Sequence, residues 1–291
     1  MYSDLSVLIV FLFLSVCRGH RSIISKNIVT IDKRQAFGVA IIQAKICFLC
    51  QSPNAIVVYK EEDLTNPCEE LSLDDIVTPM DMAYSKESNS LYITDKDTAS
   101  VWRIAFPSSD NKVHRWLDSA AADPFTLSVT RDGGVVMVKR GPPSCLEIYD
   151  PDAQLLLHLD LPTPILKPNH AVETSKGTFV VSYNEDVDVQ GGICEITTEG
   201  QLISRFDSMF ESIHGVAEDV NRQLALLAKS KCIYFNYLTI DDKDQVYVCD
   251  STHGELAVFN SRLFLLKEGI SGLKSAHRVQ FFKEQMQLMV L

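Results

Sequence analysis

Positive charge is what this sequence of 291 residues most clearly lacks. It has 27 Lys and Arg residues against 38 Asp and Glu residues, which gives a net charge of −11. A negative surface repels phosphate backbones and anionic lipid headgroups, and the basic residues are scattered along the chain. We therefore expect no nucleic-acid partner.

Two further features are absent, a nucleophile motif and an apolar run long enough to span a membrane. The sequence contains no G-x-S-x-G motif, and no Ser or Cys has a base close to it in the sequence, so nothing indicates nucleophilic catalysis. No apolar run reaches the roughly 20 residues that a helix needs to cross a bilayer. We therefore expect no membrane span in the mature chain.

The longest apolar run lies at the amino end. Leu5–Val16 (LSVLIVFLFLSV) is 12 residues long, and small residues and then the basic stretch RGHR follow it. A short apolar run before small residues is typical of a secretory signal peptide, so we predict a signal peptide over 1–19 and a secreted, extracellular protein. Two alternatives stay open, because the first four residues, MYSD, include no Lys or Arg. One is a membrane anchor through residues 5–16, and the other is an apolar start without a targeting role.

Cysteine is present, with eight residues in the whole chain, but its pattern assigns no site. Cys47 and Cys50 form a CxxC within a predicted strand, where positions three apart point to opposite faces of the sheet. They therefore cannot share a metal ion or a disulfide without an intervening turn. Cys50 with Cys68 is the candidate pair if a disulfide exists, and the pairing as a whole stays open.

The strongest positive signal is a repeat of 44 residues. Short apolar runs recur along the chain, and their matching residues lie 44 positions apart in four copies: Phe48, Tyr92, Val136 and Val180. Two more copies are centred on Tyr247 and Met289, at steps of 67 and 42. One four-stranded blade of a β-propeller takes about 40–45 residues, so the period predicts blades.

The sequence around each apolar run supports four strands per repeat. A segment that usually starts near a proline or histidine precedes the run, and turns rich in Gly, Asn, Asp and Ser separate the two, namely KESNS, RDGG, SKG and DDKD. A third and a fourth strand candidate follow in most copies, as in CLEIYD (145–150) and LLLHLDL (155–161).

These features together resemble the NHL repeat and the wider six-bladed propellers of the TolB-like class. The best match is YLTIDDKDQVYVCDSTHGELAVFNSRLFLL (237–266), followed by DMAYSKESNSLYITDKDTASVWRI (81–104), and the resemblance spans residues 36–291. It implies an all-β fold, a six-bladed β-propeller with four-stranded antiparallel blades. It implies no single activity, since such blades carry enzymes, receptors and scaffolds.

Two stretches depart from the repeat. Residues 208–236 are a surplus of about half a repeat, which we interpret as an irregular insertion, with a degenerate seventh blade as the alternative. The chain stops at Leu291 with only two strands of the last repeat, which would leave an open sheet edge. We therefore predict a propeller domain over 27–291 that an N-terminal strand closes, so that residues 27–31 pair with 286–291.

The innermost strand of each blade lines the channel of a propeller, and one position per blade lies at the channel entrance. These positions are Asp81, Thr126, His170, His277 and, if the extra segment is a blade, His214. Three imidazoles near a carboxylate have the donors of an open Zn²⁺ site, and the resemblance implies a precedent in a secreted amidating lyase with channel histidines around zinc. We name His170, His277 and Asp81 as candidate metal ligands, against the alternative that they have a structural role.

Calcium is the other metal hypothesis. The resemblance implies that lactonases of the senescence-marker type hold Ca²⁺ with a Glu, an Asn and an Asp facing the channel, and Ca²⁺ prefers oxygen donors. This chain has only Asp81 and Asn169 near such positions. The set of Ca²⁺ ligands that the resemblance implies is therefore incomplete in this chain.

What remains is a rigid disc whose loops bind another molecule. We predict a protein- or ligand-binding interaction module, a monomer without a cofactor, that binds a protein or a small molecule on its blade-loop face. The candidate contact segments precede the innermost strands or follow the second strand of a blade: 74–81, 120–125, 163–170, 272–277 and the acidic 184–192. The alternative is a metal-dependent hydrolase or lyase, lactonase-like or amidating-lyase-like, with Zn²⁺ or Ca²⁺ in the channel.

Overall fold

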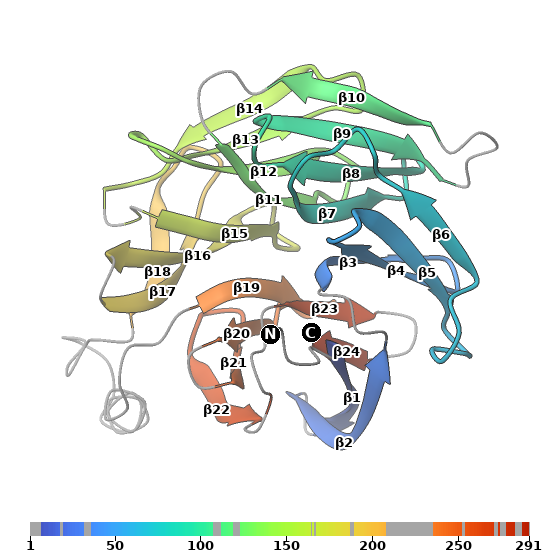
Figure 1. Ribbon diagram of the computed structural model, residues 1–291. Coiled ribbons are helices and arrows are strands. Elements are labelled where there is room, and N and C mark those ends of the chain that lie inside the picture. Colours follow the sequence, from blue (N-terminus) through green and yellow to red (C-terminus); the bar gives the residue numbers. More distant parts are fainter. Residues whose placement is uncertain are drawn as a thin grey trace.

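The computed structural model of the chain consists of β-strands joined by turns and loops (Figure 1). It describes residues 7–17, 20–31, 36–106, 112–118, 123–163, 165, 167–186, 189–207, 235–251, 254–270, 273, 278–282 and 287–290. Within these residues every regular element is a strand, and the strands form four-stranded antiparallel sheets placed like propeller blades around a central axis. The all-β propeller arrangement predicted from the repeat is therefore confirmed. In this part of the chain, no helix is long and apolar enough to cross a membrane.

Five blades consist of four strands that follow each other in the chain. The first contains β3 (Ala36–Ile42), β4 (Lys45–Cys50), β5 (Ala55–Lys60) and β6 (Glu69–Ser72). The second contains β7 (Pro79–Ser85), β8 (Ser90–Asp95), β9 (Ser100–Ala105) and β10 (Val113–Asp118). The third contains β11 (Asp123–Val129), β12 (Val135–Arg140), β13 (Cys145–Tyr149) and β14 (Leu155–Asp160). The fourth contains β15 (Lys167–Glu173), β16 (Phe179–Asp186), β17 (Val189–Ile196) and β18 (Leu202–Asp207). The fifth contains β19 (Phe235–Ile240), β20 (Val246–Asp250), β21 (Glu255–Phe259) and β22 (Leu265–Ile270).

A further sheet combines strands from the two ends of the chain. Its order is β2 (His20–Ile31), β1 (Val7–Cys17), β24 (Gln287–Val290) and β23 (Val279–Phe282). Strand β24 pairs with β23 on one side and with β1 on the other, whereas residues 27–31 pair with β1. The predicted pairing of 27–31 with 286–291 is therefore wrong. The position next to β24 is occupied by the apolar run Leu5–Val16, which the sequence suggests is a signal peptide. A continuous apolar run suits a central strand of a sheet.

The predicted insertion falls almost entirely outside the described residues. Strand β18 ends at Asp207 and β19 begins at Phe235, and residues 208–234 lie between them. The choice between an insertion and a seventh blade therefore stays a prediction.

The repeat period corresponds to one buried residue on the second strand of every sheet. We call them the repeat residues, and each is at most 2 % exposed: Phe48, Tyr92, Val136, Val180, Tyr247 and Met289. They are buried because the second strand has a neighbouring sheet on each face. Tyr92, for example, packs with Leu127 of the next blade, and Met289 packs with Val39 of the first blade. The core is thus a series of apolar interfaces between adjacent sheets.

The turns between first and second strands are tight and are bonded to the next blade. Gly133 and Gly177 have φ angles of 85° and 76°, a region that glycine adopts without strain. The Ser85 hydroxyl donates a hydrogen bond to the carbonyl of Gly133 at 3.1 Å, and the backbone N–H of Ser175 donates to Asp244 at 2.7 Å. These bonds join the turn of one blade to the turn of the next.

The cysteines form no disulfide in the part of the chain that the structure describes. Cys50 and Cys68 are not bonded to each other, so the candidate pair does not form. Cys47 packs against the second blade, whereas Cys50 packs with Met289 in the opposite interface. The CxxC residues therefore point to opposite faces of their sheet, as predicted.

Candidate functional site

The channel is lined by the first strands of the blades and by β23, which contact one another in succession. Ala83 pairs with the repeat residue Tyr92, so Asp81 lies two positions before the partner of that repeat residue. The same rule, applied to the third, fourth and fifth blades and to the sheet that contains β23 and β24, gives Thr126, His170, Tyr237 and Arg278. We call Asp81, Thr126, His170, Tyr237 and Arg278 the channel ring, and all five side chains are buried.

A buried ion pair joins two members of the channel ring. Arg278 Nη1 lies 2.6 Å from Asp81 Oδ1, and Arg278 Nη2 donates to the carbonyl of Met80 at 2.8 Å. Asp81 also accepts hydrogen bonds from the backbone N–H groups of Met82 at 2.8 Å and Leu127 at 2.9 Å. Burial raises the pKa of the Asp81 carboxyl, while Arg278 and the two N–H groups oppose that rise. Both carboxylate oxygens are therefore engaged within the protein.

His170 and Tyr237 stack on each other in the channel ring, with ring centroids 3.7 Å apart and planes 19° from parallel. The Arg278 guanidinium lies 4.3 Å from the Tyr237 centroid, within the range of a cation–π contact. Burial, and then the charge of Arg278, hold the pKa of His170 well below its usual value, so the imidazole is neutral. Its Nδ1 atom is buried and has no hydrogen-bond partner among the described residues.

Hydrogen bonds connect the channel ring across the third, fourth and fifth blades. The Thr126 hydroxyl donates to the carbonyl of Asn169 at 2.6 Å, and the Asn169 side-chain amide donates to the carbonyl of Phe235 at 2.6 Å. Arg140 donates to the carbonyl of Pro168 at 2.8 Å and to the side-chain oxygen of Asn169. Burial lowers the pKa of Arg140 to about 10. The side chain of Asn169 therefore uses both its oxygen and its nitrogen inside the protein.

A cavity of about 710 Å³ extends along the channel from the ring. Its buried end includes Leu127, His170 and Tyr237, and its exposed end includes Gln43 and Lys86. The section between the two ends is lined by aliphatic and aromatic side chains together with three polar ones: Ile41, Tyr84, Val129, Val172, Ile240 and Phe281, and Ser128, Thr239 and Gln280. The exposed end lies at the carboxyl ends of the innermost strands. Most of the predicted contact loops precede those strands and so lie at the opposite end of the channel.

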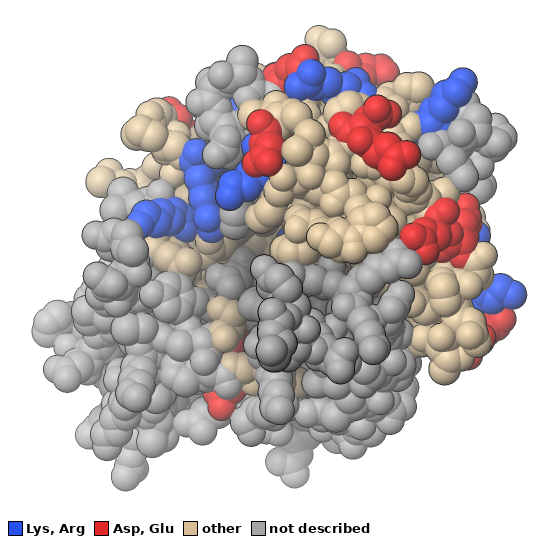
Figure 2. Space-filling model, viewed as in Figure 1, with Lys and Arg blue, Asp and Glu red and all other residues tan. Residues whose placement is uncertain are grey.

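Charged side chains of both signs occur on the described part of the face drawn in Figure 2. Asp and Glu residues lie beside Lys and Arg residues there, so this part of the surface is mixed in sign.

Two of the three candidate metal ligands, Asp81 and His170, lie in the channel ring. His277 falls outside the described residues, as does His214. Asp81 is occupied by Arg278 and backbone N–H groups, and the charge of Arg278 also acts on His170. The described residues therefore do not fit Zn²⁺ or Ca²⁺ at the ring, and we derive no chemical step through a metal there. The set of three ligands stays a prediction, because it includes His277.

Sequence reasoning missed Arg278 and Tyr237. It assigned the entrance position of the last blade to His277, one residue before Arg278, and assigned none to the strand that holds Tyr237. The spacing between the entrance position and the repeat residue could have found both. Asp81 lies 11 positions before Tyr92, and Thr126 and His170 lie 10 positions before their repeat residues. The same count leads to Tyr237 and Arg278.

Comparison with known proteins shows the fold and leaves the family open. No protein-family model matches the chain, and no curated protein matches it. A chain of a nidogen/laminin complex is similar with a TM-score of 0.65 and 11% identity, over 98% of each chain. A gluconolactonase from Xanthomonas campestris has a TM-score of 0.59 and 16% identity, over 86% of this chain and 79% of that one. The virginiamycin B lyase of Staphylococcus aureus has a TM-score of 0.54 and 12% identity, over 84% of this chain and 73% of that one. At these identities the likeness shows a β-propeller fold and nothing about activity.

Proposed function

We propose that this chain is a six-bladed propeller of the NHL-like or TolB-like kind that serves as a binding module and takes a small molecule in its channel. The observation that carries the proposal is the cavity of about 710 Å³, whose buried end lies against the channel residues His170 and Tyr237. Small-molecule sites are mostly apolar cavities of about 300–1,000 Å³ with a few fixed polar groups.

The lining of the cavity sets the chemistry of the ligand. The section between the two ends combines apolar side chains with the polar Ser128, Thr239 and Gln280, and the exposed end includes Gln43, Lys86 and Asn89. A matching molecule has a body with both apolar and hydrogen-bonding groups and a polar group that stays at the exposed end. A protein partner would have to insert a narrow apolar loop to make the same contacts.

The count of six blades belongs to the proposal. The sheet that contains β23 and β24 would act as the sixth blade and close the ring. The packing of Met289 against Val39 and Phe48 of the first blade supports this arrangement.

A metal-dependent hydrolase or lyase is the second candidate, because gluconolactonases and streptogramin lyases are among the proteins with similar folds. The engaged side chains of Asp81 and Asn169 weigh against it. This candidate predicts that Ca²⁺ or Zn²⁺ raises the melting temperature of the wild type and that His170→Gln abolishes the rise. The binding module predicts no such effect of His170→Gln on metal dependence.

We also propose a secreted, extracellular monomer without a membrane span in its mature form. The support is the apolar run followed by small residues near the amino end. The same run forms β1 in the structure, so cleavage after residue 19 would remove a strand from the β23–β24 sheet.

A fragment screen by saturation-transfer NMR tests channel binding. Val172 lines the cavity, and Val172→Trp would place an indole ring inside it and obstruct the channel. Leu156→Trp is the matched control, since Leu156 is 62 % exposed on the outer strand β14. We expect fragments that bind the wild type and the Leu156→Trp variant but not Val172→Trp. Fragments that bind all three equally, or an absence of binders to the wild type, would contradict the proposal.

A further inference from the structure

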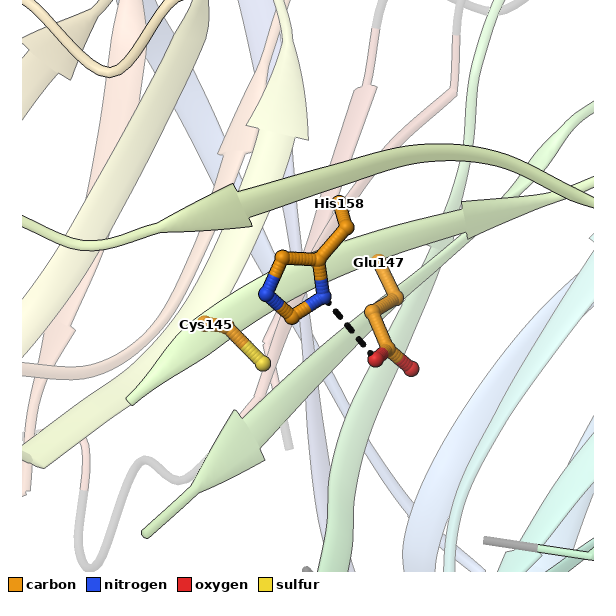
Figure 3. A group of neighbouring side chains, drawn as sticks. All are labelled: Cys145, Glu147 and His158. Carbon is orange, nitrogen blue, oxygen red and sulfur yellow. Dashed lines mark hydrogen bonds and ion pairs between the residues drawn. The ribbon is translucent and has the colours of Figure 1, made fainter. Parts of the chain in front are cut away.

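A second group of polar side chains lies on the third blade, away from the channel, and it includes three different metal-ligating side chains. Cys145 and Glu147 are two positions apart on β13, and His158 of β14 pairs directly with Glu147. Residues two apart on a strand, and residues directly opposite on its partner, share one face of the sheet. All three side chains therefore project from the same face (Figure 3).

The donor atoms of these side chains are close together. His158 Nδ1 lies 3.2 Å from Glu147 Oε1, and the sulfur of Cys145 and the other two donors all lie within 4.8 Å of one another. Donors bound tetrahedrally to one zinc ion, at about 2.0–2.3 Å from it, are about 3.5 Å apart. Small side-chain rotations would bring the three atoms to that spacing.

The carboxylate of Glu147 is oriented by two neighbours. Lys139 Nζ lies 2.8 Å from Oε2, and the Tyr149 hydroxyl donates to the same oxygen at 2.6 Å. Oε1 is left to face His158. Hydrogen-bond partners behind a ligand fix its direction.

His158 is oriented in the same way from its other nitrogen. Asp160 Oδ1 lies 3.2 Å from Nε2, so Nε2–H can donate to the carboxylate while Nδ1 keeps its lone pair for a metal. A carboxylate behind a metal-binding imidazole is a recurring arrangement that fixes the tautomer. The side chain of His158 is 45 % exposed, which gives an ion a route from solvent and leaves a position for water.

We propose that Cys145, Glu147 and His158 bind Zn²⁺, with a water molecule as the fourth ligand. Thiolate, imidazole and carboxylate together are donors that zinc accepts in tetrahedral geometry, whereas Ca²⁺ and Mg²⁺ take oxygen donors. Binding releases the proton of the Cys145 thiol. The bound ion joins the outermost strand β14 to β13, independently of any ligand in the channel.

Cobalt replaces zinc in such sites and reports on thiolate ligation by its absorption spectrum, so Co²⁺ is the probe. The full chain, freed of metal by a chelator, is titrated with Co²⁺ and then with Zn²⁺ in competition. We expect one Co²⁺ per chain with a thiolate-to-metal band that Zn²⁺ displaces. Cys145→Ser should remove the band, His158→Gln should weaken binding at least about tenfold, and Asp160→Asn should weaken it about 10–100-fold.

Two variants serve as matched controls. Cys68 is a free, exposed thiol of the first blade, and His114 is an exposed histidine of β10, so Cys68→Ser and His114→Gln should leave the titration unchanged. His158→Gln replaces a half-exposed side chain and keeps the test valid if Cys145→Ser does not fold. The site is refuted if the wild type shows no thiolate band, if the band persists in Cys145→Ser, or if His158→Gln binds as tightly as the wild type.

Discussion

Replacing Arg278 with methionine tests the ion pair that joins the channel ring. Methionine keeps most of the apolar stem but leaves Asp81, which is 0 % exposed, without its cation. Removing one partner of a buried ion pair costs about 3–5 kcal/mol. Two backbone N–H groups still bond Asp81, so we expect about 3 kcal/mol, the lower end of that range, from urea unfolding at neutral pH.

The pH dependence of this variant separates an electrostatic effect from a loss of packing. Burial raises the pKa of Asp81 and Arg278 opposes the rise, so removing Arg278 raises the folded-state pKa further. A group whose pKa is higher in the folded state contributes stability that is fully present below the unfolded-state pKa and is lost as pH rises through the folded-state pKa. The stability deficit of Arg278→Met should therefore shrink as the pH is lowered from neutral toward the ordinary Asp range near about 4.

Arg131→Met is the matched control for this experiment. The Arg131 side chain is 53 % exposed and lies 3.9 Å from Asp244, and exposed pairs of this kind contribute about 0–1 kcal/mol. The reasoning is refuted if Arg278→Met costs no more than Arg131→Met, or if its deficit does not change with pH.

Three further predictions address the cavity, the turns and the amino end. His170→Phe should change the free energy of urea unfolding by less than about 1 kcal/mol, because it removes an unpartnered nitrogen and keeps an aromatic ring; a cost above about 3 kcal/mol would contradict this. Asp244→Ala should cost about 1–3 kcal/mol in urea unfolding, because the N–H of Ser175 loses its acceptor, while the exposed Glu199→Ala should cost nothing measurable; equal effects would contradict this. Protein collected from the medium of expressing cells should have the intact mass of a chain without residues 1–19. The mass of the full-length chain would contradict cleavage and would agree with the apolar run forming β1.

Local pattern was enough to predict the blades. The repeat residues, such as Tyr92 and Val136, are buried on second strands because each repeat carries its own hairpin turns and apolar alternation. The entrance positions Asp81 and His170 followed from the same period.

Contacts between distant parts of the chain were not predictable in this way. Arg278 is 197 positions from Asp81, and nothing in either repeat marks the other as its partner. The strand beside β24 was also assigned wrongly, since Leu5–Val16 satisfies both a signal peptide and a buried strand. The cluster of Cys145, Glu147 and His158 depends on the register between β13 and β14, which a bulge shifts between Ile148 and Tyr149.

The most direct test of channel binding is a crystal structure of the protein soaked with a fragment from the screen. We predict density for the fragment inside the cavity of about 710 Å³, in contact with the lining residue Val172. Density only on the outer surface or at the loops before the innermost strands, or a channel filled by the protein's own side chains, would contradict the proposed function.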